Sequence, residues 1–407
     1  MRPNRSTCVI VVTVVSAIGI LLLHAKTADT VAPARVQRVG GLSAADFPGH
    51  EYGGAIQDVA IAPDGRALAV KFAAGEGRDK AGLFLGLWSL PESKLLLKIR
   101  LAASHGITNP VRTMHTLEFS PDGTAIVVAE GSSIYILDAA TLKLLHSIGL
   151  PTNAQISKYP PFVRTFSVSR NSTTLAILSG DGPYAPGVDL VRVFRLKTGD
   201  ETAHWNPAEK LKSISISNSG ELLLAGTWDP KQPEDVLLME ALTGKTLRRF
   251  RSGFAYGQGY SNLSTAVFLE DHKFLAVPDH FVDSTGKYAD HIKLVDSSTG
   301  VTLEDLSYDR FGPTGVLAIS GDEKIIIALN YPQKRAKGAQ LLFYRSARKT
   351  PFCVLDPIPV RESDGKNTAN ISFSLDPTLF AIFTPQNLGV YKVSNCNFSP
   401  EESLNSD

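Results

Sequence analysis

Short apolar segments and tight polar turns alternate along almost the whole chain of 407 residues. The clearest copy has an apolar segment ending at Phe119, a Ser-Pro-Asp-Gly turn at 120–123, and further apolar segments at 125–129 and 134–138. The unit recurs at intervals of roughly fifty residues, a period typical of architectures in which each repeat packs against the next. The apolar residues that enter the seven turns are Ile61, Phe119, Val168, Ile216, Phe268, Ile319 and Phe373.

The composition of each unit predicts strands joined by hairpins. Asp, Asn, Gly and Pro dominate the turns, where they tolerate left-handed backbone or preset φ. The apolar segments are short, rich in Val, Ile, Leu and Phe, and show no sustained helical period. The third segment of a unit ends near Asp-x-x-Thr-Gly or a related sequence, as at 296–300. Four strands in each of seven units predict an all-β fold, a seven-bladed β-propeller with four-stranded antiparallel blades.

The last unit indicates how the ring closes. It offers strands at 369–374, 378–383 and 388–393, with little chain left for a fourth. We expect residues 34–39, at the other end of the chain, to supply that strand, because closure removes exposed sheet edges.

The N-terminus predicts export. Arg2 and Arg5 precede an uncharged, mostly apolar run from Ser6 to Leu23, as in a secretory signal. This length suits both a cleaved signal peptide and an uncleaved signal-anchor, and a buried strand suits it less well. The predicted organisation is a signal or membrane anchor at 1–30, the propeller at 31–398 and a polar tail at 399–407. The propeller is then periplasmic or extracellular, anchored through residues 6–23 if the signal is retained.

The charge balance excludes one class of partner. Lys plus Arg is 41 and Asp plus Glu is 40, so the formal net charge is +1. Nucleic-acid binding needs a clustered positive surface, and we expect no such partner. We expect a monomer that binds a protein or envelope ligand and contacts a membrane only through its N-terminal segment.

Two cysteines lie in the predicted propeller, Cys353 and Cys396, whereas Cys8 belongs to the apolar run. The pair falls on neighbouring blades, so a disulfide is possible in an oxidising compartment. We favour the alternative of two separate buried thiols.

The long connections fall on one side of the predicted disc. Strand direction alternates in a blade, so second-to-third connections and those between blades share one face, here called the long-loop face. The first-to-second and third-to-fourth turns are short and share the other, the short-turn face. Length added on one face of a repeat protein usually marks the binding face. The long connections are 73–82, 102–113, 151–161, 180–189, 227–234, 251–263, 278–290, 330–338 and 357–368.

The long-loop face has aromatic and charged residues suited to recognition. Aromatic side chains are enriched at interfaces because they bury much area at low entropy cost. The alternative is that several fold back as lids over the core. The segment 253–260 combines glycines with aromatics and is the first to test. The candidate residues are Tyr184, Trp228, Asp229, Phe254, Tyr256, Tyr260, Asp279, His280 and Tyr331.

Motifs for catalysis are missing from the sequence. There is no Cys-x-x-Cys-His, no His-Glu-x-x-His and no Gly-x-Ser-x-Gly, so we assign no catalytic residue, cofactor or metal ligand. One exception is the Asp-His pair at 279–280 with the second pair at 290–291, which bracket one connection and could form a metal or acid–base site. We favour solvated loop residues there, and a structural role within its blade for His115.

The turns and the Asp-x-x-Thr-Gly ends resemble those of WD-repeat and YVTN-type β-propellers, especially divergent exported bacterial members, over residues 36–398. The Trp-Asp ending of WD repeats is absent: Trp88-Ser89, Leu137-Asp138 and Val295-Asp296 stand in its place. This departure argues against the hydrogen-bonded His–Asp arrangement of such blades. The superfamily includes scaffolds, lactonases and quinoprotein dehydrogenases, and none of their catalytic signatures is matched.

Two functions remain open. The first is a non-catalytic propeller that binds through the long-loop face. The alternative is a lactonase-like or quinoprotein-dehydrogenase-like enzyme acting at the central channel, with Asp181, Asp229 and Asp279 at its mouth.

Overall fold

The structure of the protein is a computed structural model. It describes residues 35–43, 46–47, 55–75, 81–90, 92–101, 116–150, 161–181, 189–227, 235–251, 266–282, 288–306, 315–330, 339–346, 348–358 and 370–396. The predicted signal or anchor and the polar tail lie outside these residues. No helix in this part of the chain is long and apolar enough to cross a bilayer.

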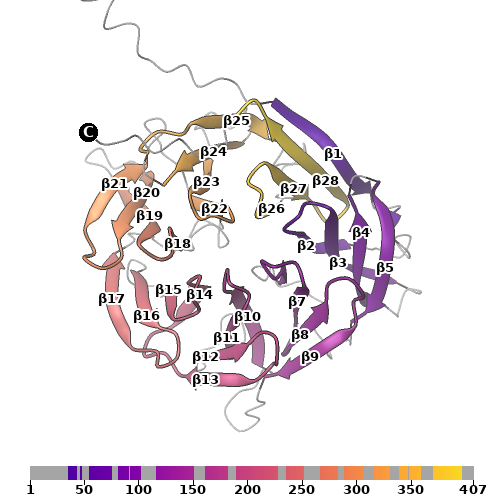
Figure 1. Cartoon of the computed structure of the whole chain (residues 1–407), viewed down its shortest axis with the longest axis horizontal. Helices are drawn as coiled ribbons and strands as arrows, with labels where there is room; N and C mark the ends of the chain where they lie inside the picture. The colour runs from indigo at the N-terminus through magenta and orange to yellow at the C-terminus, as the bar shows by residue number, and fades with distance from the viewer. Residues whose placement is uncertain are drawn as a thin grey trace, which may run out of the picture. The chain divides into compact units, whose positions relative to one another are not determined.

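The described strands form seven antiparallel sheets of four strands, arranged as blades around a central axis (Figure 1). This confirms the predicted seven-bladed propeller. Innermost strand first, blade 1 is β2 (Ala55–Ile61), β3 (Ala67–Gly75), β4 (Ala81–Ser89) and β5 (Lys94–Arg100). Blade 2 is β6 (Leu117–Phe119), β7 (Ala125–Glu130), β8 (Ser133–Asp138) and β9 (Leu144–Gly149). Blade 3 is β10 (Pro161–Val168), β11 (Thr174–Asp181), β12 (Leu190–Arg195) and β13 (Glu201–Trp205).

The remaining blades follow the same order. Blade 4 is β14 (Leu211–Ile216), β15 (Leu222–Thr227), β16 (Asp235–Glu240) and β17 (Thr246–Arg251). Blade 5 is β18 (Val267–Leu269), β19 (Phe274–Val282), β20 (Tyr288–Asp296) and β21 (Thr302–Leu306). Blade 6 is β22 (Gly315–Ile319), β23 (Ile325–Asn330), β24 (Ala339–Arg345) and β25 (Cys353–Ile358). Blade 7 is β26 (Asn370–Phe373), β27 (Leu379–Phe383), β28 (Asn387–Ser394) and β1 (Arg35–Ser43).

Blade 7 joins the two ends of the propeller. β1 pairs antiparallel with β28, from Arg35 opposite Ser394 to Ser43 opposite Asn387, and Figure 1 shows the indigo strand beside the yellow one. The expected closure by residues 34–39 is therefore confirmed, and the strand extends four residues beyond Val39.

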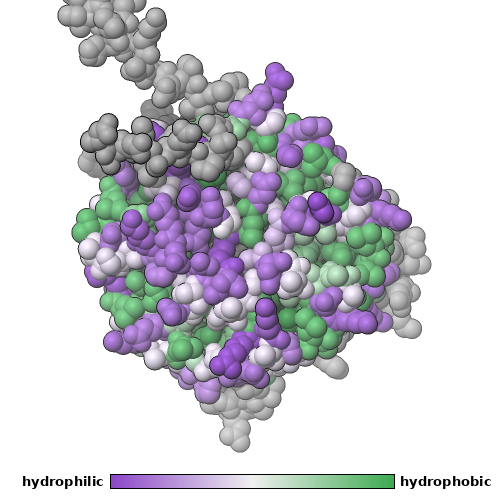
Figure 2. Space-filling model, viewed as in Figure 1, coloured by the Kyte–Doolittle hydropathy of each residue, from purple (hydrophilic) through white to green (hydrophobic). Residues whose placement is uncertain are grey.

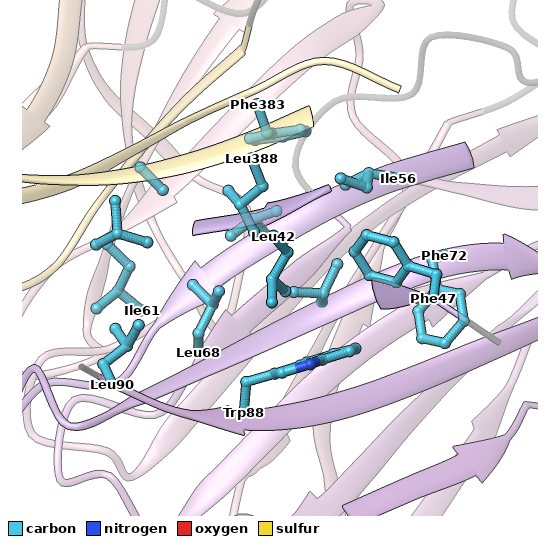
Figure 3. Packing of buried hydrophobic residues seen from close by; sticks show 14 of the residues in the cluster. Leu42, Phe47, Ile56, Ile61, Leu68, Phe72, Trp88, Leu90, Phe383 and Leu388 are labelled. Carbon is cyan, nitrogen blue, oxygen red and sulfur yellow. The ribbon is translucent and has the colours of Figure 1, made fainter. Parts of the chain in front are cut away.

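Apolar side chains fill the space between neighbouring blades. Between blades 7 and 1, Trp88 packs with Phe47 and Phe72, next to Leu42 of β1 and Leu388 of β28 (Figure 3). The ring centroid of Phe47 lies 5.0 Å from the ring centroid of Phe72 and 5.5 Å from that of Trp88. This cluster stabilises the packing of β1 and β28 against blade 1, because burial of large apolar side chains contributes most of the free energy of folding.

Local hydrogen bonds explain the repeated turn sequence. Ser120 Oγ donates to Asp122 Oδ1 at 2.6 Å and accepts from the Ala125 amide at 2.9 Å. The same carboxylate accepts from the Thr124 amide at 3.1 Å. Ser320 and Asp322 form the equivalent pair in blade 6. Each turn thus satisfies its own backbone, which is why short polar side chains recur there.

The Asp-x-x-Thr-Gly ends are also capped locally. Asp138 Oδ1 accepts from the Thr141 amide at 2.8 Å and from its hydroxyl at 2.7 Å, and Asp296 bonds Thr299 likewise. Gly300 follows with φ of 77°, a left-handed conformation that favours glycine.

Two expectations are corrected by the structure. The favoured pair of separate thiols is wrong, since Cys353 and Cys396 form a disulfide with a Cα–Cα distance of 5.7 Å. The expected connection at 278–290 is mostly strand, because β19 runs to Val282 and β20 begins at Tyr288. Pro278 is tolerated there because the described pairing of β18 with β19 reaches only Ala276, so Pro278 lies beyond the part of β19 that is paired on both sides.

Candidate functional site

Most of the predicted recognition residues lie outside the described part of the chain. These are Tyr184, Trp228, Asp229, Phe254, Tyr256, Tyr260 and Tyr331, together with His115. Asp279 and His280 belong to β19, in the long hairpin of blade 5.

The strand register separates the two Asp-His pairs. Asp279 is the cross-strand partner of His291, and His280 is the partner of Asp290. Successive cross-strand pairs occupy opposite faces of a sheet. The four positions are therefore two successive cross-strand pairs of one hairpin. Among the described residues, no three His, Cys, Asp or Glu side chains come together in a group that could hold a metal ion.

The acids proposed for a channel-mouth enzyme belong to different blades. Asp181 ends β11 in blade 3 and Asp279 lies in blade 5, while Asp229 is outside the described residues. Blade 4 thus stands between the first two positions.

Beneath the long-loop face, buried carboxylates connect neighbouring blades. Asp58 in β2 is 8% exposed and accepts from the amide of Thr116 at 2.6 Å and from its hydroxyl at 3.0 Å. Thr116 ends the connection that enters blade 2, so this bond fixes the base of a long connection.

A second anchor lies between blades 3 and 4. The buried Asp189 accepts from the Leu211 amide at 2.7 Å and lies 2.8 Å from Nη1 of Arg164. Arg164 also donates to the Leu211 carbonyl at 2.9 Å. Asp189 precedes β12 and Leu211 begins β14, so both lie on the long-loop side. The two anchors thus hold Thr116 and Asp189, the residues at which two long connections end.

On the short-turn side, an arginine joins two blades that are not neighbours in the ring. Arg170 lies in the turn after β10, and its Nη2 donates to the carbonyl of Ile319 in blade 6 at 3.3 Å. Blades 4 and 5 separate these blades along the chain, so the side chain spans the ring. Burial lowers the pKa of Arg170, and the carboxylates of Glu323, Glu118 and Asp322 act in the other direction. Burial likewise raises the pKa of Glu323, which accepts from the Asp271 amide at 2.8 Å.

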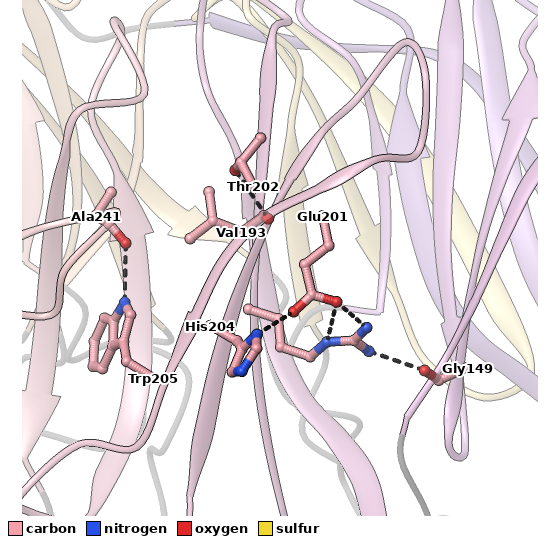
Figure 4. Close-up of polar contacts among 8 residues, drawn as sticks. Gly149, Val193, Glu201, Thr202, His204, Trp205 and Ala241 are labelled. Atoms are coloured by element: carbon pink, nitrogen blue, oxygen red, sulfur yellow. Dashed lines mark hydrogen bonds and ion pairs between the residues drawn. The ribbon is translucent and has the colours of Figure 1, made fainter.

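A His-Glu-Arg group on the outside of blade 3 is structural rather than catalytic in geometry (Figure 4). Glu201 pairs with Arg192, and its other oxygen lies 2.9 Å from Nδ1 of His204. Arg192 also donates to the Gly149 carbonyl of blade 2 at 2.9 Å. The hydrogen bond from Arg192 lowers the pKa of Glu201, so this carboxylate is a poor general base. Beside it, Trp205 donates to the Ala241 carbonyl of blade 4 at 3.0 Å.

Sequence reasoning missed the residues that join the blades. Asp58 and Asp189 carried a weak signal, because a carboxylate near a strand that is otherwise apolar needs a partner. Arg170 carried none, since its contact lies 149 residues away.

The four-stranded blades and their ring define the class of protein, a seven-bladed β-propeller. The WD40 domain of Neurospora crassa Pan2 is similar to it with a TM-score of 0.55 and 12% sequence identity. That similarity covers 88% of this chain and 96% of the Pan2 chain. At this identity the likeness establishes the fold alone. No family model matches the sequence, and no curated protein does.

Proposed function

We propose that this protein is an exported, non-catalytic propeller that binds a protein or another extracellular ligand through its long-loop face. The observation that carries the proposal is the unequal length of connections on the two faces. Turns such as 120–124 and 169–173 are brief, whereas 101–116, 150–160, 252–266 and 359–369 separate successive blades. Insertions gathered on one face of a repeat fold usually form its binding surface.

Export is supported by two independent features. The uncharged run at 6–23 follows two arginines, and the disulfide between Cys353 and Cys396 belongs in an oxidising compartment. Fusing residues 1–40 to a reporter that works only outside the cytoplasm should give activity. Activity of a cytoplasm-only reporter on the same fusion would contradict export.

The fold also favours binding over catalysis. Propellers of this fold are commonly protein-interaction scaffolds.

The decisive experiment uses a photo-crosslinking residue placed at Tyr256 or Tyr260 in the long-loop face. We expect a discrete crosslinked partner in envelope extract, and we expect Tyr256→Ala with Tyr260→Ala to abolish its capture. An interface anchor can contribute about 2 kcal/mol or more to binding, while exposed loop aromatics contribute little to folding.

A crosslinker at Lys245, an exposed residue of the short-turn face, is the matched control and should capture nothing. Equal crosslinking at both faces would contradict the proposal. A loss of stability by a few kcal/mol on removing the tyrosines would instead identify them as buried lids.

A further inference from the structure

One sector of the propeller's outer edge combines cations with exposed apolar residues. It is formed by β1, β5 and β9, the outer strands of three consecutive blades, and we call it the basic rim. These strands contain five cations and no carboxylate, and the turns that precede β5 and β9 add Glu92 and Lys143. The rim residues are Arg35, Val36, Arg38, Lys94, Leu96, Lys98, Arg100, Leu144 and Leu145.

The rim is exposed and continuous across blades 7 and 1. Leu96 is 50% exposed, Leu144 is 57% and Leu145 is 48%, high values for large apolar side chains. β1 contacts the turn before β5, because the Gly41 amide donates to Ser93 Oγ at 3.3 Å. Figure 2 shows one flat face of the propeller, where hydrophobic and hydrophilic residues lie side by side, and the rim runs along the edge of that view.

Exposed and partly buried side chains alternate along β5, and its three charged side chains are exposed. Leu97 and Ile99 pack into the cluster between blades 1 and 2. Because Lys98 lies between Leu97 and Ile99 and side chains alternate along a regular strand, Lys98 points to the other side, toward blade 7. Lys98 Nζ lies 5.1 Å from the ring centroid of Phe84, which belongs to the cluster shared with blade 7.

Exposed leucines alone do not distinguish this sector, since Leu247 of β17 and Leu303 of β21 are also exposed. The charges differ, because Arg249 of β17 pairs with Asp235 and Glu209, and β21 carries two carboxylates. Within the described part of the chain, the five rim cations form no ion pair with a carboxylate.

Interleaved cations and apolar side chains fit the boundary between lipid headgroups and acyl chains. The chain also enters the propeller at this edge, and the apolar run 6–23 precedes β1 by residues 24–34 only. That linker spans at most roughly 40 Å when extended, so a retained anchor would keep β1 near the membrane. We propose that the basic rim binds an anionic lipid surface, which sets the disc edge-on and leaves the long-loop face open to a partner.

The test uses residues 27–407, which lack the apolar run but keep every described strand of the closed ring. We expect this chain to sediment with vesicles of phosphatidylcholine and phosphatidylglycerol, not with phosphatidylcholine alone, and to be released by salt. Each cation near such a surface strengthens binding roughly fivefold. The triple change Lys94→Glu, Lys98→Glu and Arg100→Glu should therefore weaken binding by at least about tenfold.

Two matched controls separate the rim from general charge and hydrophobicity. Lys245→Glu, Lys273→Glu and Lys349→Glu alter the net charge equally on exposed positions of blades 4, 5 and 6 and should bind as the unchanged chain does. A second comparison sets Leu96→Ser with Leu145→Ser against Leu247→Ser with Leu303→Ser, and only the first pair should weaken binding.

Failure of the unchanged chain to bind anionic vesicles would overturn the proposal, as would equal losses in the two charge triples. The rim would instead be a binding site for a soluble polyanion if the chain bound a single-stranded oligonucleotide and this binding required the rim cations but not the rim leucines. That result would contradict the lipid proposal. If the glutamate triple lowers the Tm, the corresponding glutamine triple replaces it and should still weaken binding.

Discussion

At the scale of single residues, the propeller depends on short polar side chains that satisfy particular backbone groups. Within blades, Ser120 and Asp122 close a turn, and between blades Asp58 bonds the amide of Thr116. Buried polar groups contribute little net energy when paired but cost much when a partner is removed. The two classes should therefore respond differently to substitution.

Replacing Asp58 with alanine should destabilise the protein by about 1–3 kcal/mol, because the buried Thr116 amide loses its acceptor. Thermal unfolding should report a Tm lower by several degrees, and Asp58→Asn, which keeps an acceptor oxygen, should lose less. Asp64→Ala, in an exposed turn of the same blade, is the control and should stay within roughly 0.5 kcal/mol. Equal effects at both positions would show that Asp58 does not anchor blade 2.

Asp296 should make stability depend on acid pH. Hydrogen bonds from Ser298 and Thr299 lower its pKa from 3.8 to about 2. A depressed pKa in the folded state gives stability that is present above pH 3.8 and is lost as the pH falls through about 2. The Tm difference between the unchanged chain and Asp296→Ala should accordingly be full at neutral pH and shrink across that window. A difference that does not vary with pH would exclude this linkage.

At the scale of strands, closure is the feature that makes the ring one unit. β1 supplies the outer strand of blade 7, and the disulfide ties β25 of blade 6 to the residues just after β28. Both links act on the blade where the two ends of the chain meet.

Reduction of the disulfide should destabilise the protein by roughly 2–4 kcal/mol, because the unfolded chain regains the freedom of a loop of 43 residues. Denaturant unfolding with and without reductant measures the effect. Cys353→Ser with Cys396→Ser should unfold as the reduced chain does and should no longer respond to reductant. A response to reductant in that variant would mean that the disulfide is not its cause.

At the scale of the whole molecule, the number of blades could be predicted because each turn is built from neighbours in sequence. Ser120, Asp122 and Thr124 bond one another, so the pattern repeats wherever the turn does. The disulfide and the Arg170 contact could not be predicted, since they depend on how separate blades meet. The extension of β19 to Val282 was not predicted either, because Pro278 fits a strand only where β18 no longer pairs with it. The recognition residues remain predictions, as most of them lie outside the described residues.

Removing the charge of Arg170 should have a pH-dependent effect. Arg170→Met leaves Glu323 buried without this opposing charge, and we expect a loss of about 1–3 kcal/mol near neutral pH. Since burial already raises the pKa of Glu323, losing Arg170 should raise it further, so the deficit should grow as the pH rises and vanish when the carboxyl is protonated. Glu323→Gln in the Arg170→Met background should restore part of the stability, and additive losses would contradict the coupling.

The pairing of the first strand with the last also orders events during synthesis. Ser394 donates to the carbonyl of Arg35, a residue 359 positions earlier in the chain. At 5–20 residues per second, β1 waits roughly 20–70 s for its partner, with its edge open to other chains. Chaperones that hold the nascent chain are therefore most needed before β28 emerges. A chain that ends before Asn387 never completes the ring, so translation through β28 is itself a condition for ring closure.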